Sequence, residues 1–155
     1  MKSHTAEFLN LRDEVDQGLA QAGRTYRLIE GFCGPGGMSL GLKWAGFEIA
    51  RAFDLDRPSI DTHKRNLGDH GRVWDAKEVN GFAMMSELNL KRGELDLFAG
   101  GPPCQGFSKQ KRGAHLGDTR NDLVVEYIRI AHELMPRFFF FENVAIFGRS
   151  EASNT

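Results

Sequence analysis

Residues 8–22 of this chain carry apolar side chains three or four positions apart, separated by polar and charged ones. This spacing predicts an amphipathic helix that packs its apolar side against the rest of the protein. The apolar stripe consists of Phe8, Leu11, Val15, Leu19 and Ala22.

Short apolar runs and helical patterns alternate along the remainder of the chain. Strands are expected at 26–32, 47–53, 72–74, 95–99 and 138–141, and helices at 39–45, 58–66, within 81–94 and at 122–134. The last helix has the clearest pattern, with Leu123, Tyr127, Ile130 and Leu134 on one face and Pro136 after its end. This order predicts an α/β fold with a doubly wound, mostly parallel, Rossmann-like sheet.

Four consecutive phenylalanines, Phe138 to Phe141, form the last strand pattern. The run has no alternation of apolar and polar positions. It therefore predicts a strand that is buried on both faces, as in a parallel sheet covered by helices.

Length and composition are those of one soluble globular domain: 155 residues, 41% hydrophobic and 26% charged. No apolar run approaches the roughly 18 residues that span a bilayer, and the N-terminus lacks a signal-peptide core, so a cytoplasmic protein with no membrane association is expected. Cys33 and Cys104 have no histidine or cysteine at metal-ligand spacing, so neither a metal site nor a disulfide framework is expected.

A glycine-rich turn, Gly34-Pro35-Gly36-Gly37, leads from the first predicted strand into a helix. Such a turn presents free backbone N–H groups and a helix N-terminus to a polar ligand, and missing side chains permit close approach. Ser39 stands where the third glycine of the G-x-G-x-x-G fingerprint would be, so the turn indicates a cofactor without identifying it.

Carboxylates follow the next two predicted strands. Asp54 comes directly after the second strand, where a carboxylate can bind the ribose hydroxyls of a nucleoside cofactor. Asp56 is alternatively a helix cap, as Pro58 in the first turn also indicates. Asp75 and Ala76 end the third strand, where Asp75 either reaches an adenine amino group or caps the segment that follows.

The segment 100–108, with the sequence GGPPCQGFS, follows the fourth predicted strand. Two prolines fix the backbone of this loop, and three glycines let it approach a flat substrate closely, so it presents one thiol, that of Cys104, at the sheet edge where ligands bind. A lone intracellular cysteine is alternatively a small buried apolar residue. Lys109 to Arg112 form a basic cluster beside the loop in a chain whose net charge is only -1.

Glu142 lies at the carboxyl end of the phenylalanine strand, on the same edge as Cys104. A partly desolvated glutamate favours its protonated form and can donate a hydrogen bond to a base nitrogen. It is equally consistent with a loop cap or with an ion pair to Arg137 or Arg149.

Together these motifs resemble the cytosine-C5 DNA methyltransferases, whose hallmark is a Pro-Cys-Gln core. The resemblance covers residues 32 to 144 and implies the fold of S-adenosylmethionine-dependent methyltransferases, incomplete at the C-terminus. By this resemblance the cofactor S-adenosylmethionine would be bound by Phe32, Gly34, Gly36, Gly37, Asp54, Leu55, Asp75, Ala76, Pro103 and Leu123. The catalytic residues would be Cys104 and Glu142, and the cytosine would also be held by Gln105, Ser108 and Asn143.

The chemistry that the resemblance implies is covalent. The Cys104 thiolate adds to C6 of a cytosine flipped out of double-stranded DNA, which makes C5 nucleophilic, while Glu142 meets N3. C5 then takes the methyl group, and loss of the C5 proton expels Cys104.

The family's Gln-x-Arg-x-Arg motif, target-recognition domain and final motif have no counterpart here. The expected organisation is a packing helix at 1–24, a partial cofactor-binding catalytic domain at 25–147 and a polar tail at 148–155. A prokaryotic or phage DNA methyltransferase that needs a second polypeptide for its missing half is therefore one hypothesis. An inactive remnant that at most binds cofactor, and a tRNA methyltransferase relative, are the others.

Overall fold

The computed structural model describes residues 25–103 and 122–143 of the chain. They form a five-stranded, wholly parallel sheet in the order β3-β2-β1-β4-β5. The strands are β1 (Tyr26–Gly31), β2 (Phe47–Asp54), β3 (Gly71–Val73), β4 (Leu97–Gly100) and β5 (Phe138–Phe141). The helices are α2 (Gly37–Trp44), α3 (Arg57–Leu67), α4 (Gly81–Glu87) and α5 (Asp122–Leu134). The predicted doubly wound α/β fold is confirmed.

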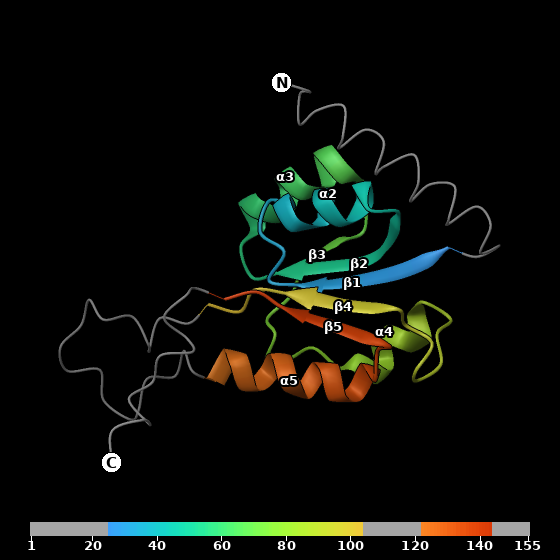
Figure 1. The fold of residues 1–155 in the computed structure, drawn as a ribbon. Helices are drawn as coiled ribbons and strands as arrows, with labels where there is room; N and C mark the ends of the chain where they lie inside the picture. Colours follow the sequence, from blue (N-terminus) through green and yellow to red (C-terminus); the bar gives the residue numbers. More distant parts are fainter. Residues whose placement is uncertain (1–24, 104–121, 144–155) are drawn as a thin grey trace, which may run out of the picture.

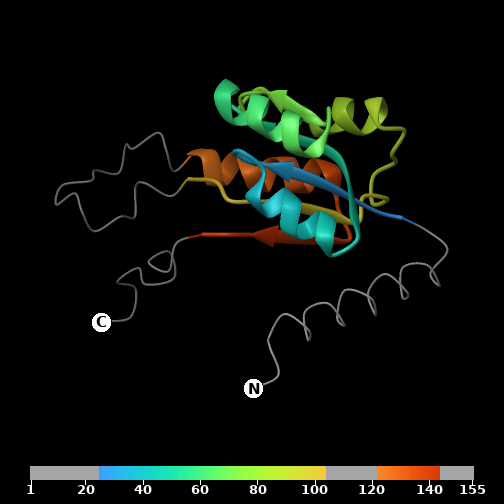
Figure 2. The same ribbon diagram turned by 90° about the horizontal axis from the view of Figure 1, so that it is seen from above.

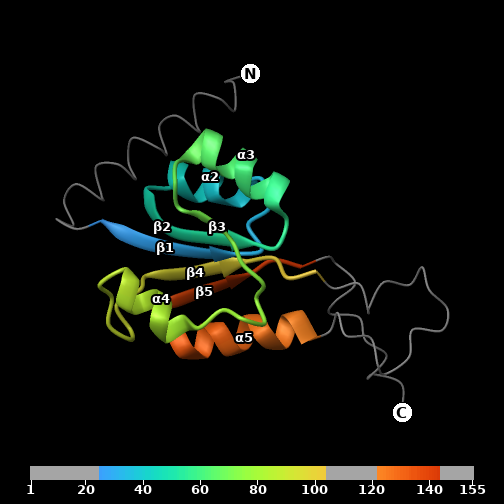
Figure 3. The same ribbon diagram turned by 180° about the vertical axis from the view of Figure 1, so that it is seen from behind.

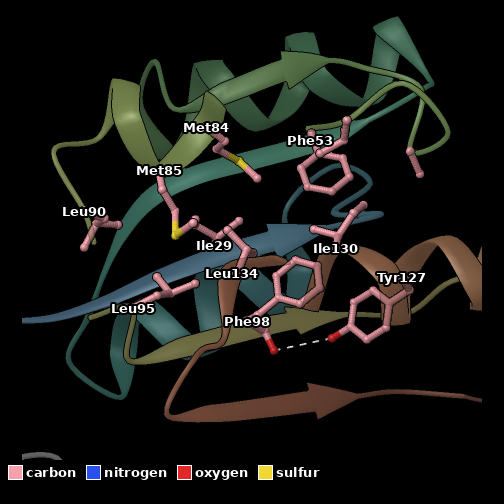
Figure 4. Close-up of a cluster of buried hydrophobic side chains, with 12 residues drawn as sticks. Ile29, Phe53, Met84, Met85, Leu90, Leu95, Phe98, Tyr127, Ile130 and Leu134 are labelled. Carbon is pink, nitrogen blue, oxygen red and sulfur yellow. Dashed lines mark hydrogen bonds between the residues drawn. The ribbon is translucent and has the colours of Figure 1, made fainter. Parts of the chain in front are cut away.

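Helices cover both faces of the sheet, with α2 and α3 on one face and α4 and α5 on the other (Figures 1 and 3). Each face has its own apolar core. Beneath α4 and α5, the core includes Ile29, Met84, Phe98, Tyr127 and Ile130, which Figure 4 shows converging between the helices and the strands.

The sequence patterns explain where the helices begin and end. Asp56 caps α3, because its Oδ2 accepts a hydrogen bond from the Ser59 amide over 2.9 Å. On the other face of the sheet, α5 buries Tyr127, Ile130 and Leu134 completely, as its apolar spacing predicts. The helix stops at Leu134 because the next residue, Met135, has φ of 46° and Pro136 follows.

The prediction that the phenylalanine strand is buried on both faces is wrong. Phe138, Phe139 and Phe140 are 72%, 56% and 50% exposed. The strand lies at the edge of the sheet, and Figure 2 shows α3 over the opposite part of the sheet, away from it. Only Phe141 packs against the core on the α5 side. A run without alternation indicates that both faces are apolar, but it does not show that this chain itself covers them.

Some predicted segments lie outside the described residues: the helix at 8–22, the Cys104 loop from residue 104 to 108 and the polar tail at 148–155. None of the helices in the described ranges has the length and hydropathy needed to cross a membrane.

Candidate active site

A cavity of about 330 Å³ opens at the carboxyl ends of the strands. Parallel α/β sheets bind their ligands at this edge. The walls of the cavity are formed by Phe32, Phe53, Asp54, Leu55, Trp74, Ala76, Gly101, Pro103 and Leu123. Of the predicted cofactor residues, the structure thus brings together Phe32, Asp54, Leu55, Ala76, Pro103 and Leu123.

Three aromatic rings give the cavity an apolar wall. The ring centroids of Phe32 and Phe53 lie 6.4 Å apart, and those of Phe53 and Trp74 lie 6.1 Å apart. The sequence pattern identifies Phe53 and Trp74 only as strand residues. Each of them lies at the carboxyl end of a strand, and these ends meet where parallel sheets bind their ligands. That position was the sequence signal that could have assigned them to the cavity.

The glycine turn borders the cavity without lining it. Gly34 has φ of 52° and Gly36 has φ of 101°, conformations that favour glycine. A side chain at Gly36 would also collide with Leu67 and His63, because its Cβ would lie 2.6 Å and 3.0 Å from them. Gly34 and Gly37 instead face open space. The turn is therefore packed tightly on its inner side and accessible on its outer side.

Asp54 holds this turn in place through its carboxylate. Its Oδ2 accepts a hydrogen bond from the Gly34 amide and its Oδ1 accepts one from the Asp56 amide, each over 2.9 Å. Each carboxylate oxygen can accept a further hydrogen bond, and Asp54 is one of the residues that line the cavity. The two aspartates therefore differ in position: Asp54 lines the cavity, whereas Asp56 caps α3.

Asp75 lies beside this cavity rather than in it. Its Oδ1 accepts a hydrogen bond from the Lys77 amide over 2.9 Å, and residues 76–78 form a turn. Asp75 lines a neighbouring cavity of about 350 Å³ together with Trp74, Glu78 and Glu87. The structure therefore separates Asp75 from Ala76, which the sequence analysis grouped as one adenine-binding pair.

Arg129 on α5 is a positioning residue that the sequence analysis missed. Its guanidinium donates to the carbonyl oxygens of Ala76 and Val79 over 3.0 Å and 2.9 Å, and it also pairs with Glu126 and Glu133 over 2.6 Å. Burial by itself lowers the pKa of Arg129, but the two glutamates raise it above its ordinary value. Arg129 thereby fixes the segment that carries Ala76 into the cavity wall. No local pattern predicts contacts between residues about 50 positions apart.

Glu142 lies beside the beginning of the Cys104 loop. The Glu142 amide donates to the Gly100 carbonyl over 2.9 Å, and a Cβ on Gly101 would lie 3.0 Å from Glu142 Oε2. The Glu142 side chain is exposed, so the expected partial desolvation is not found in this structure. Asn143 next to it is half-buried. Cys104, Gln105 and Ser108 lie outside the described residues.

The described part of the site thus combines a cavity of about 330 Å³, a glycine turn held by a carboxylate, and an acid next to a proline loop. The family profile of the C-5 cytosine-specific DNA methylases matches residues 26–155. The chain belongs to this family.

The relatives of this chain include Type II methyltransferases. It is 39% identical to M.XorII of Xanthomonas oryzae pv. oryzae over 117 residues, which are 75% of this chain and 27% of M.XorII. It is 38% identical to M.HgiGI of Herpetosiphon aurantiacus over 119 residues, which are 76% of this chain and 90% of M.HgiGI. M.AquIA of Picosynechococcus is 34% identical over 119 residues, with 48% of its length covered. The chain therefore spans between about a quarter and a half of the length of several curated relatives.

Solved structures agree with the fold. The crystal structure of a candidate DNA modification methyltransferase encoded within a prophage of E. coli superposes with a TM-score of 0.70 at 33% identity, covering 83% of this methylase chain and 35% of the other. The Dnmt2 methyltransferase of S. pombe superposes with a TM-score of 0.61 at 22% identity, covering 81% and 38% of the two chains, and shows the same fold.

Proposed function

We propose that this chain forms the cofactor-binding and nucleophile-bearing part of an enzyme that transfers a methyl group from S-adenosylmethionine to C5 of cytosine in double-stranded DNA. The observation that carries the proposal is the position of Pro103. It lines the cavity together with Asp54, and the next residue along the chain is Cys104. A methyl donor in the cavity would therefore lie next to the loop that bears the thiol.

The residues around the cavity fit S-adenosylmethionine. A volume of about 330 Å³ is within the range of small-molecule sites. Phe32, Phe53 and Trp74 offer an apolar surface for the adenosine part, and Asp54 offers acceptors for its ribose hydroxyls. The first turn of α2, which begins at Gly37 with open space around it, offers backbone donors to the carboxylate of the methionine part. When bound, S-adenosylmethionine supplies an activated methyl group.

The roles of the chain's own groups follow from the chemistry of cytosine. The Cys104 thiolate forms a bond to C6, and the electron pair displaced from the C5–C6 double bond makes C5 nucleophilic. Glu142 holds N3 of the ring and stabilises this addition. C5 accepts the methyl group, a base removes the C5 proton, and the electron pair of that C–H bond restores the double bond as the Cys104 thiolate leaves.

We infer that turnover needs polypeptide in addition to these 155 residues, whether in the same chain or in a second one. The curated relatives M.XorII and M.AgeI extend well beyond the part that matches this chain. The matched part is 27% of M.XorII and 28% of M.AgeI. In addition, Phe138, Phe139 and Phe140 expose apolar surface at the sheet edge that further structure would cover. The lengths of the relatives support a requirement for more protein, and the exposed phenylalanines support the β5 edge as the place where it packs.

Covalent trapping tests this proposal. Duplex DNA in which 5-fluorocytosine replaces cytosine in many sequence contexts is incubated with S-adenosylmethionine and either the chain or its Cys104→Ser variant. Fluorine at C5 cannot leave as a proton does, so the adduct persists on a denaturing gel. Cofactor binding is measured in parallel by calorimetry.

We expect saturable cofactor binding and no adduct from the chain alone. An adduct that the Cys104→Ser variant lacks would support the chemistry and refute the need for further polypeptide. An adduct in both proteins would refute the role of Cys104. Absence of both binding and adduct would contradict the proposal and favour an inactive remnant.

A further inference from the structure

Glu30 places a carboxyl group in the interior of the protein, near the carboxyl end of β1. It is 1% exposed and lies in register between Ala52 on β2 and Ala99 on β4, both of which are fully buried. The two small neighbours leave room for its side chain on the face covered by α2 and α3, because Ala52 and Ala99 belong to the apolar core on that face. A carboxyl group there is stable only with a polar partner.

Ser39 and His63 provide a hydrogen-bonded chain from Glu30 across both helices. The Ser39 hydroxyl on α2 bonds to Glu30 Oε2, and His63 Nε2 on α3 lies 3.0 Å from Ser39 Oγ. Both residues are completely buried. The other ring nitrogen of His63, Nδ1, has no hydrogen-bond partner among the described residues.

This chain of bonds supports the glycine turn from below. Ser39 lies in the first turn of α2, two residues after Gly37. The ring of His63 limits the space at Gly36, where an added Cβ would come within 3.0 Å of His63 Cδ2. A change in the position of the His63 ring would therefore move the turn that borders the cofactor cavity.

The direction of the hydrogen bonds depends on one proton. When Glu30 is ionised, Ser39 donates to it and accepts from Nε2–H of His63, so Nδ1 is a bare lone pair. When Glu30 is protonated, it donates to the Ser39 oxygen, and the Ser39 hydroxyl then donates to His63 Nε2. Because Nε2 is now an acceptor, a neutral His63 must carry its proton on Nδ1. That buried N–H then has no acceptor, and an unpaired buried donor is costly.

We propose that Glu30, Ser39 and His63 form a proton-sharing network that positions the glycine turn and makes its affinity for the cofactor depend on pH. The inference rests on the proposed function for the identity of the cofactor. The network itself is a property of the protein without a ligand.

Electrostatics place this proton exchange near neutral pH. Burial raises the pKa of Glu30 to about 7, against the lowering effect of the Ser39 hydrogen bond and with a further rise from Asp54. Burial, together with His70, lowers the pKa of His63, which favours the neutral ring. In the described part of the chain, the titratable groups that interact electrostatically with Glu30 or His63 are Cys33, Asp54, His70 and Tyr127.

The expected direction follows from charge and geometry together. S-adenosylmethionine carries a sulfonium cation, which an ionised Glu30 beneath the turn attracts. The protonated network instead leaves the unpaired N–H on the ring that packs against Gly36. Affinity for S-adenosylmethionine should therefore rise with pH, by about fivefold between about pH 6 and about pH 8, at the lower end of typical coupling between two sites.

Calorimetric titration of the 155-residue chain with S-adenosylmethionine across this pH range tests the proposal. Glu30→Gln retains size and hydrogen bonding but removes the titration, and Glu48→Gln makes the same change at an exposed position of β2. We expect the fivefold rise in the chain and in Glu48→Gln, and less than twofold in Glu30→Gln. A flat profile in the unmodified chain, or the same rise in Glu30→Gln, would overturn the network's role.

Amide NMR of the ligand-free chain makes the result independent of cofactor binding. The amide shifts of Gly34, Gly36 and Gly37 should titrate with a midpoint near pH 7 in the chain, as the Glu30 carboxyl carbon does, and should be constant in Glu30→Gln. If no variant binds S-adenosylmethionine at any pH, the proposed cofactor is wrong, whereas the glycine shifts still support or overturn the network.

Discussion

The backbone amide of Gly34 donates a hydrogen bond to Asp54 Oδ2 over 2.9 Å, which joins the glycine turn after β1 to the end of β2. The same carboxylate lines the cavity. One side chain therefore shapes the turn and presents acceptors to a ligand. Asp54 connects the local conformation to the proposed binding of S-adenosylmethionine.

Replacing Asp54 with asparagine should weaken cofactor binding. An amide has one acceptor oxygen where the carboxylate has two, so one of the bonds to the Gly34 and Asp56 amides is lost. We expect Kd for S-adenosylmethionine to rise at least about tenfold, which corresponds to about 1.4 kcal/mol. Asp56→Asn is the control, because asparagine caps helices as well as aspartate does. Equal loss of affinity in both variants would refute the assignment of Asp54.

Arg129→Met should destabilise the protein and loosen the cavity wall. The change removes the bonds to the carbonyls of Ala76 and Val79 and the ion pairs with Glu126 and Glu133. We expect the free energy of unfolding in urea to fall by about 2 kcal/mol. Arg92→Met removes one exposed bond to the His132 carbonyl and should cost under about 0.5 kcal/mol. Similar losses in the two variants would contradict the positioning role of Arg129.

A matched pair of glycine substitutions tests the packing of the strands beneath the site. A Cβ at Gly100 would lie 2.5 Å from the Gly31 carbonyl oxygen and 2.7 Å from Tyr127 Cε2. Gly100→Ala should therefore cost about 2 kcal/mol or more of unfolding free energy. Gly41→Ala, in open space within α2, should instead stabilise the protein by about 0.5 kcal/mol. Thermal unfolding compares the two, and an unchanged midpoint for Gly100→Ala would show that the strands are less tightly packed than described.

The buried carboxyl of Glu30 should make stability depend on pH. Its pKa is about 7 in the folded protein and near 4.5 without burial, so the folded state holds an extra proton between these values. The contribution of Glu30 to stability is therefore fully present below about pH 4.5 and is lost as pH rises to about 7. Relative to the unmodified protein, Glu30→Gln should gain up to about 3 kcal/mol between these limits, which urea unfolding at several pH values measures. A difference that does not vary with pH would refute the raised pKa.

Much of the fold is predictable because local pattern and global architecture agree. The α5 face of Tyr127, Ile130 and Leu134 is buried as its spacing predicts, and the Asp56 and Pro58 signals mark the beginning of α3. The glycine turn and Asp54, 20 positions apart, come together because β1 and β2 are adjacent parallel strands.

The remainder depends on contacts that have no local signature. The sequence shows that Phe138 to Phe141 are apolar, but their exposure depends on what covers the edge of the sheet. Arg129 and the Glu30–Ser39–His63 network are similar cases, since each is assembled from separate elements. An acidic residue within the apolar run of β1 was the one local sign of the network.

The most direct test of the account is an NMR titration of the ¹⁵N-labelled chain with S-adenosylmethionine. A third cavity, at the amino ends of the strands and lined by Tyr26, Phe47 and Arg137 among others, provides an internal reference. We expect saturable shifts of the amides of Phe32, Gly34, Asp54, Ala76 and Leu123, with the residues of this third cavity unchanged. Shifts confined to the third cavity, or none at all, would contradict the assignment of the cofactor site.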